Sequence, residues 1–256
     1  MRRRFDLTDF EWSIIEPLLP NKSRGVPRVD DRRVINGILW RFRTGSPWAD
    51  IPERYGPYTT CYNRFVRWRK AGVWDRLLEA VSAAFEGDLQ MIDSSCVRVH
   101  HHGATPKKGD PNRCMGRSRG GLTTKIHALV DAEGRPVRLH LSEGQSSDCV
   151  NAEALLDLLS QDTILLADKG YDTDSIRARI QSAGAFANIP AKSNRKQAFP
   201  FSAFLYRYRN LVERFFGKIK NARGLATRYD KRADNFLAAL KLFSARLWIR
   251  SYESTP

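Results

Sequence analysis

The chain has 256 residues, of which 42% are hydrophobic and 28% are charged, and its formal net charge is +15. It can bury a sizeable core, in one large domain or two small ones. The excess of positive charge favours a polyanionic partner, most often nucleic acid, over a merely basic solvated surface. No run of about 18 apolar residues predicts a membrane span, and the acids in "MRRRFDLTDFEW" argue against a secretory signal.

The four cysteines are scattered along the chain and form no CxxC pair. This spacing argues against a zinc knuckle and indicates reduced thiols, as in a cytosol. We therefore expect a cytoplasmic protein that has no membrane partner.

Residues 1–86 are predicted to be helical. "LTDFE" offers a capping box, with Thr8 as the N-cap and Glu11 three residues later. "DDRRVINGILWRFRTGSP" repeats apolar residues at helical spacing and ends at a turn. In "YTTCYNRFVRWRKAG", Tyr62, Phe65 and Val66 are expected to face the core, and four cations are expected to face outward: Arg64, Arg67, Arg69 and Lys70. Such a region resembles a helix-turn-helix DNA reader, and an ordinary helical bundle with a basic face fits equally well.

The pattern changes at residue 87. "DLQMIDSSCVRVH" is predicted to be a strand, and "LTTKIHALVDAEGRPVRLHLSEG" is predicted to be a hairpin around "AEGRP". A helix, the strand "DTILLAD", a second helix and the strand "AFANIPA" follow, and residues 202–251 are mostly helical. This order predicts a mixed α/β sheet flanked by helices. The segment 101–121, rich in Gly, Pro and basic residues, is predicted to be a long loop.

Three acids stand out by their surroundings. Asp93 lies in a mostly apolar strand, Asp168 closes "ILLA" at the carboxyl end of another, and Glu213 is the lone acid of "YRYRNLVERFFGKIK". Taken singly, each strand aspartate fits an ordinary strand-end residue, and Glu213 fits a surface ion pair with Arg209.

The helix around Glu213 offers more than an ion pair. Tyr206, Arg209, Glu213 and Lys220 project within an arc of roughly 60° on an α-helix, opposite an apolar face. Carboxylates on a basic protein bind Mg²⁺ together with phosphate oxygens, and the cations around them hold the polyanion. This combination explains a single acid in so basic a segment.

The spacing Y-x2-R-x3-E-x6-K, together with "MIDSS" at Asp93 and "LLADKGYD" at Asp168, resembles the DDE transposases of bacterial insertion sequences, in the insertion-sequence-five branch. The resemblance covers nearly the whole chain, including "GSPWADIPERYGPYTTCYNRFVRW" and "GRSRGGLTTKIHALVD". It implies a helix-turn-helix-like DNA-binding domain over residues 1–86 and an RNase H-like catalytic domain with a mixed sheet over residues 87–256. Metal-dependent cleavage and strand transfer of a mobile DNA element would then be the activity.

The resemblance also implies a set of site residues. Asp93, Asp168 and Glu213 would be catalytic and would hold two Mg²⁺ ions, for which Mn²⁺ would substitute. Double-stranded DNA, both the terminal inverted repeats and the target, would be the partner of a homodimer or higher oligomer in the bacterial cytoplasm, near the nucleoid. The expected DNA contacts, besides the four outward cations, are Tyr206, Arg209, Lys220, Arg117, Arg119, Lys125 and Lys169.

Two other classes remain open: a transposase-derived DNA-binding regulator without catalysis, and a structure-specific nuclease with the same fold. The run His100 to His102 could bind zinc or nickel, although a polar loop or a phosphate contact is favoured because no paired Cys or second His cluster supports a metal. "GRSRGG" lacks the Lys-Ser or Lys-Thr ending of a P-loop, which argues against nucleotide hydrolysis.

Overall fold

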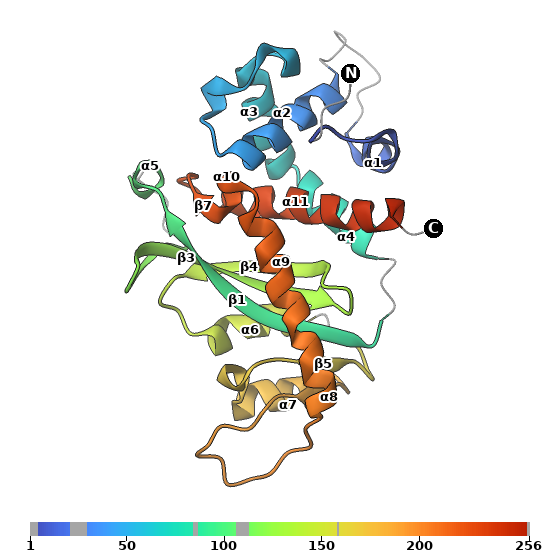
Figure 1. Cartoon of the computed structure of the whole chain (residues 1–256), viewed down its shortest axis with the longest axis vertical. Helices are drawn as coiled ribbons and strands as arrows, with labels where there is room; N and C mark the ends of the chain where they lie inside the picture. Colours follow the sequence, from blue (N-terminus) through green and yellow to red (C-terminus); the bar gives the residue numbers. More distant parts are fainter. Residues whose placement is uncertain (1–4, 21–29, 84–86, 106–112, 158, 255–256) are drawn as a thin grey trace. The chain divides into compact units, whose positions relative to one another are not determined.

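The computed structural model describes residues 5–20, 30–83, 87–105, 113–157 and 159–254 (Figure 1). The chain forms two compact units, one made of residues 1–83, 100–108 and 219–256 and the other of residues 84–99 and 109–218. The predicted division at residue 86 does not coincide with these units, because the C-terminal helix belongs with the N-terminal ones. The assignment of DNA binding to residues 1–86 and of catalysis to residues 87–256 remains a prediction.

The first unit is helical, as expected. Its helical elements are α1 (Asp9–Ile15), η1 (Glu16–Leu18), α2 (Asp31–Thr44), η2 (Trp48–Asp50), η3 (Glu53–Tyr55), α3 (Tyr58–Lys70), α4 (Val73–Ser82), α5 (His101–Ala104), α10 (Arg223–Ala226) and α11 (Ala233–Glu253), and it also holds the short strand β7 (Thr227–Arg228). The apolar positions predicted for α2 are buried, and Gly45 ends that helix with a φ of 73°, a conformation that favours glycine. The helix-turn-helix-like character of this region remains a prediction.

The second unit is built around a mixed sheet, as expected. Its elements are β1 (Leu89–Val99), β2 (Gly116–Ser118), β3 (Gly121–Asp131), β4 (Pro136–Glu143), α6 (Asp148–Leu156), β5 (Ile164–Leu166), η4 (Lys169–Tyr171), α7 (Asp174–Ser182), β6 (Phe186–Asn188), α8 (Ala203–Tyr206) and η5 (Arg207–Arg209). The helix α9 (Asn210–Lys220) passes from this unit into the first. The segment predicted as one long loop contains α5 and β2, and its residues 106–112 lie outside the described part of the chain.

The sheet has the RNase H-like order. Strand β3 pairs antiparallel with β1 and with β4, which confirms the predicted hairpin. On its other edge, β1 pairs in parallel with β5, and β5 pairs in parallel with β6. The chain can return to parallel strands because the helices α6 and α7 lie between them in sequence and pack on the core. The RNase H-like fold class is therefore confirmed. No helix among the described residues is long and apolar enough to cross a membrane.

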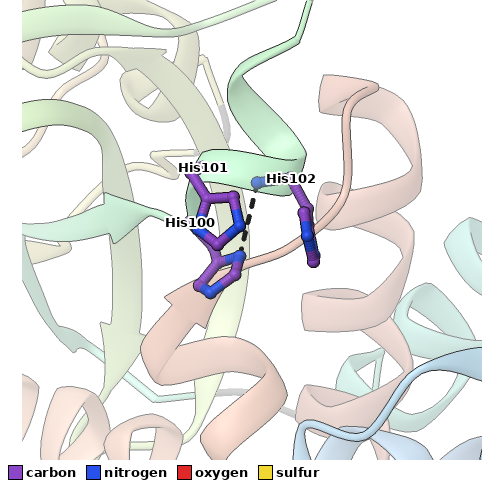
Figure 2. A group of neighbouring side chains, drawn as sticks. All are labelled: His100, His101 and His102. Carbon is purple, nitrogen blue, oxygen red and sulfur yellow. Dashed lines mark hydrogen bonds between the residues drawn. The ribbon is translucent and has the colours of Figure 1, made fainter.

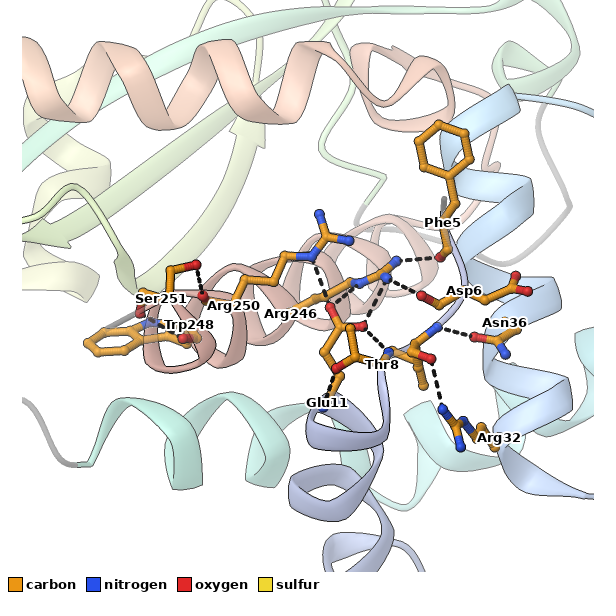
Figure 3. Close-up of polar contacts among 12 residues, drawn as sticks. Phe5, Asp6, Thr8, Glu11, Arg32, Asn36, Arg246, Trp248, Arg250 and Ser251 are labelled. Atoms are coloured by element: carbon orange, nitrogen blue, oxygen red, sulfur yellow. Dashed lines mark hydrogen bonds and ion pairs between the residues drawn. The ribbon is translucent and has the colours of Figure 1, made fainter. Parts of the chain in front are cut away.

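A buried carboxylate holds the ends of the first unit together (Figure 3). The capping box predicted at Thr8 is present, and the carboxylate of Glu11, which is fully buried, also accepts hydrogen bonds from Arg246 Nε at 2.8 Å and Arg250 Nε at 2.9 Å. Arg246 also donates to the carbonyl oxygens of Phe5 and Asp6. Burial acts to raise the pKa of Glu11, but the hydrogen bonds and the charge of Arg246 outweigh it, and the pKa is lowered.

We expect Glu11→Gln to lower the free energy of unfolding at pH 7 by about 3–5 kcal/mol, because it leaves the Arg246 charge buried and unpaired. The contribution of ionised Glu11 is present above its unfolded pKa of 4.5 and is lost as the pH falls through the lower folded value, so the gap to the parent narrows in acid. Urea unfolding of the parent and the variant, at pH 7 and at lower pH, measures this difference in the free energy of unfolding.

The control is Asp9→Asn, which breaks an ion pair with Arg32 in which the Asp9 side chain is 97% exposed. That variant should lose less than about 1 kcal/mol. Equal losses in the two variants would show that the buried network does not anchor the unit.

Candidate active site

Strand β1 places Asp93 in the middle of the sheet, opposite Ala128 of β3. The carboxylate is half-buried, and its Oδ1 accepts a hydrogen bond from the Ser94 N–H at 2.7 Å. Burial raises the pKa of Asp93, the nearby carboxylate of Asp168 adds to the rise, and the Ser94 N–H and Arg209 oppose it. The charges of Asp93 and Asp168 are therefore close enough to act on one another.

Asp168 follows β5, the strand parallel to β1, and lies at the carboxyl end of that strand. Its Oδ1 accepts a hydrogen bond from the Gly170 N–H at 2.7 Å, which caps the short helix η4. A Cβ atom on Gly170 would come within 2.7 Å of the same oxygen. A side chain at position 170 would therefore require the Asp168 carboxylate to shift.

Arg209 links Asp93 to Glu213. Its NH1 lies 2.9 Å from Asp93 Oδ2, and its NH2 lies 2.6 Å from Glu213 Oε1. The Arg209 and Asp93 side chains are each 19% exposed, whereas that of Glu213 is 57% exposed. Burial acts to lower the pKa of Arg209, but Asp93, Tyr206 and Glu213 more than offset it and the pKa is raised. A permanent cation therefore sits between two of the three predicted acids.

The helix around Glu213 differs from the straight α-helix that was predicted. A 3-10 turn, Arg207–Arg209, separates α8 from α9. The apolar face of α9 is buried through Val212, Phe215 and Phe216, which leaves Glu213 on the outer side. Arg209 and Glu213 still meet at i,i+4, and the guanidinium of Arg209 lies 5.7 Å from the centre of the Tyr206 ring.

A second polar cluster lies beside Asp93, and sequence reasoning singled out only its Lys125, as a DNA contact. Ser94 Oγ donates to Asp148 Oδ1 at 2.7 Å, and Lys125 Nζ lies 3.0 Å from the same oxygen and donates to the Ser146 carbonyl. The aspartate begins α6 and fits an ordinary helix start, so sequence gave no reason to single it out. A fourth carboxylate, that of Asp148, is therefore hydrogen-bonded to the residue that follows Asp93.

Tyr171 is a buried tyrosine whose titration these acids influence. The residue is only 2% exposed, and its hydroxyl makes no hydrogen bond of normal geometry with the described residues. Burial raises its pKa, and the carboxylates of Asp148, Asp93 and Asp168 raise it further, while Ser94 offsets a part. A buried donor without a partner beside carboxylates is a group that a bound ligand or water could satisfy.

The predicted DNA-contacting cations fall into two groups. The prediction that Arg64 faces outward is wrong, because it is 8% exposed, pairs with Asp31 and lies over the Trp68 ring. The outward orientation predicted for Arg69 is also wrong, because Arg69 pairs with Asp234 and its side chain is only 10% exposed. Tyr62, expected in the core of the same helix, is instead 39% exposed. The remaining predicted cations outside the acidic site are exposed and available to a phosphate: Arg67, Lys70, Arg117, Arg119, Lys169 and Lys220.

Three family models match the chain. Residues 7–78 match a model described as "Putative transposase of IS4/5 family". Residues 85–198 and residues 165–250 match two further models, each described as "Transposase DDE domain". The helical region and the sheet are therefore both similar to parts of transposases.

Proteins of other insertion elements are similar to parts of this chain. A Brucella ovis protein named "Putative transposase for insertion sequence element IS6501" is 37% identical over 130 residues, which are 50% of this chain and 100% of that protein. A Burkholderia cepacia protein named "Insertion element IS402 uncharacterized 16.2 kDa protein" is 37% identical over 107 residues, which are 36% of this chain and 73% of that protein.

Similarity to a solved structure is remote. The piggyBac transposase synaptic complex with hairpin DNA has 9% sequence identity and a TM-score of 0.42, over 98% of this chain and 80% of that one. Likeness at this level identifies no residue of the site.

We expect Tyr171→Phe to keep the free energy of unfolding or to raise it by about 1 kcal/mol, because it removes a buried hydroxyl that lacks a hydrogen-bond partner. Urea unfolding measures the change. The matched control is Tyr55→Phe, which loses a hydrogen bond of 2.9 Å to Asp6 and should cost about 1 kcal/mol. A loss at Tyr171 as large as that at Tyr55 would mean that the Tyr171 hydroxyl is already satisfied.

Proposed function

This chain belongs to the DDE transposases of bacterial insertion sequences, and we propose that Asp93, Asp168 and Glu213 are its catalytic acids. The family is made of metal-dependent enzymes that cleave and transfer DNA strands. In this chain, the acids lie on β1, after β5 and on α9, within the second unit.

The shared contact of Arg209 with Asp93 and Glu213 is the observation that carries this assignment. It relates an acid on a central strand to an acid on a helix far along the chain. The influence of the Asp168 charge on Asp93 adds the third member. A purely structural ion pair between Arg209 and Glu213 would not account for the half-buried Asp93 on the same guanidinium.

The donor set fits hard divalent ions. Three carboxylates supply oxygen ligands of the kind that Mg²⁺ and Mn²⁺ take, and we propose that two Mg²⁺ ions are the natural cofactors. Bound there, such ions would activate the attacking water or DNA 3′-hydroxyl and stabilise the leaving 3′-oxygen. No covalent bond between protein and DNA is then needed.

Arg209 competes with these ions for the carboxylates. Its guanidinium occupies one oxygen of Asp93 and one of Glu213, and the three acids do not form a closed ligand cluster among the described residues. Metal binding through these two oxygens would therefore require Arg209 to release them, and a DNA phosphate offers it another anionic partner. In this proposal Arg209 moves from acid to phosphate as the substrate arrives.

The exposed cations bind the rest of the DNA. Lys220 on α9 and Lys169 next to Asp168 would hold DNA phosphates. Tyr206 would stack on a base or donate a hydrogen bond beside Arg209. Residues 1–86 would recognise the terminal inverted repeats, through exposed groups such as Arg67 and Lys70. We propose that a homodimer or higher oligomer brings the two ends together.

We expect Glu213→Gln to abolish most Mg²⁺-dependent nicking of DNA that bears the element's ends, because an amide is a poor substitute for a carboxylate on Mg²⁺. Activity should fall by orders of magnitude. The free energy of unfolding should change by less than about 1 kcal/mol, since the ion pair is exposed. DNA binding in EDTA should hold or tighten, because a negative charge has left the DNA-facing surface.

The second unit offers a matched control, Glu133→Gln. Glu133 is 61% exposed and pairs at 2.6 Å with Arg135, which also binds the buried Asp131, so the same kind of pair is broken elsewhere. Its nicking should stay near the parent rate. Near-parent nicking by Glu213→Gln would refute the assignment. Parent protein that binds the ends without cleaving indicates a regulator, and cleavage without joining indicates a nuclease.

Arg209→Ala separates competition from substrate positioning. Loss of the guanidinium leaves the acids without a resident cation, so the free protein should bind Mn²⁺ several-fold more tightly, as measured by electron paramagnetic resonance. Nicking should nevertheless fall, because a phosphate contact is lost. Unchanged or weaker Mn²⁺ binding would show that Arg209 does not compete with the metal.

A further inference from the structure

Three consecutive histidines converge at the turn that directly follows β1 (Figure 2). The ring centres of His100, His101 and His102 lie 4.1, 4.9 and 4.1 Å apart in pairs. One nitrogen from each ring lies within 4.8 Å of the others, and no other His, Cys, Asp or Glu group in the described part of the chain meets this criterion. The three rings therefore bring one nitrogen each into the same small region.

This convergence is not a trivial result of adjacency. Neighbouring residues on an α-helix point about 100° apart, so three in a row normally spread around the axis. Here, His100 is the N-cap of α5, with an extended backbone at φ −66° and ψ 148°, and its ring folds back over the turn. Its Nδ1 accepts a hydrogen bond from the His102 N–H at 3.3 Å.

The turn is anchored on one side and open on the other. The His100 N–H donates to the Arg228 carbonyl at 2.9 Å, and the His100 ring lies 4.8 Å from that of Tyr229. All of these residues belong to the first unit. His101 and His102 are exposed, so an ion can reach the rings from solvent.

We propose that His100, His101 and His102 form a binding site for a divalent transition ion of the Zn²⁺, Ni²⁺ and Cu²⁺ class. Imidazole nitrogens suit these borderline ions, whereas the carboxylates proposed to act in catalysis suit Mg²⁺. Three protein ligands leave a further coordination position for water or another ligand. The site is chemically separate from the proposed catalytic one, and neither depends on the other.

The geometry needs only small side-chain movements. Zn–N bonds of 2.0–2.1 Å place two nitrogens on a tetrahedral ion roughly 3.4 Å apart. The present separations reach 4.8 Å, and rotation of the exposed His101 and His102 side chains can close the difference.

Equilibrium dialysis of the full-length chain, purified without a polyhistidine tag, tests the proposal. Zn²⁺ or Ni²⁺ is titrated in a large excess of Mg²⁺, which occupies the carboxylates. We expect one transition ion per chain, and nitrogen hyperfine structure in the electron paramagnetic resonance spectrum when Cu²⁺ is used. The double variant His101→Ala/His102→Ala should weaken binding at least about tenfold. Both side chains are exposed, so its melting temperature without metal should match the parent.

Two controls keep the outcome specific. His140→Gln alters a half-buried histidine on β4, and Glu213→Gln alters a proposed catalytic acid, and both should bind the transition ion as the parent does. Absence of binding by the parent, or binding that survives the double histidine variant, would overturn the proposal. So would binding lost only in Glu213→Gln. If the double variant binds the transition ion as the parent does but binds DNA less well in EDTA, the histidines contact phosphate instead, and the proposal is overturned.

Discussion

The shared guanidinium of Arg209 is the interaction on which the candidate site depends. It joins a strand residue and a helix residue more than a hundred positions apart, and it does so by charge rather than by packing. A cation between two ionised carboxylates offsets the repulsion between their like charges. Arg209 supplies that cation to Asp93 and Glu213.

The first unit uses the same chemistry for a different purpose. Glu11 and Arg246 are both buried and hydrogen-bonded, so their pair fixes the N-terminal segment to α11 and has no room for exchange. Arg209 instead contacts one half-buried and one exposed carboxylate, and each contact uses a single guanidinium nitrogen. Exposure separates a structural clamp from a contact that a phosphate or metal can replace, because water and ligands reach only the second.

The acids of the site have unequal surroundings. Burial has the largest effect on the pKa of Asp93, and the neighbouring groups shift that pKa in opposite directions. The Glu213 side chain, in contrast, is largely exposed to solvent. The carboxylate of Asp148 is tied to Ser94 and Lys125, and the Tyr171 hydroxyl lies buried beside the group. These supporting groups come from β1, β3, α6 and the turn after β5, so the site rests on the rigid part of the sheet rather than on a loop.

Sequence reasoning correctly predicted the capping box at Thr8, the apolar stripe of α2, the hairpin of β3 and β4, and the family signature around Glu213, because each depends on residues close together in the chain. It failed for Arg64, because a helical projection gives a residue's direction but not the partner, here Asp31, that meets it. Only the tertiary structure placed Arg209 between Asp93 and Glu213, joined Asp148 to Ser94 and gathered the three histidine rings. Contacts between distant elements depend on strand register and on the path of the backbone at each cap, and local spacing carries neither.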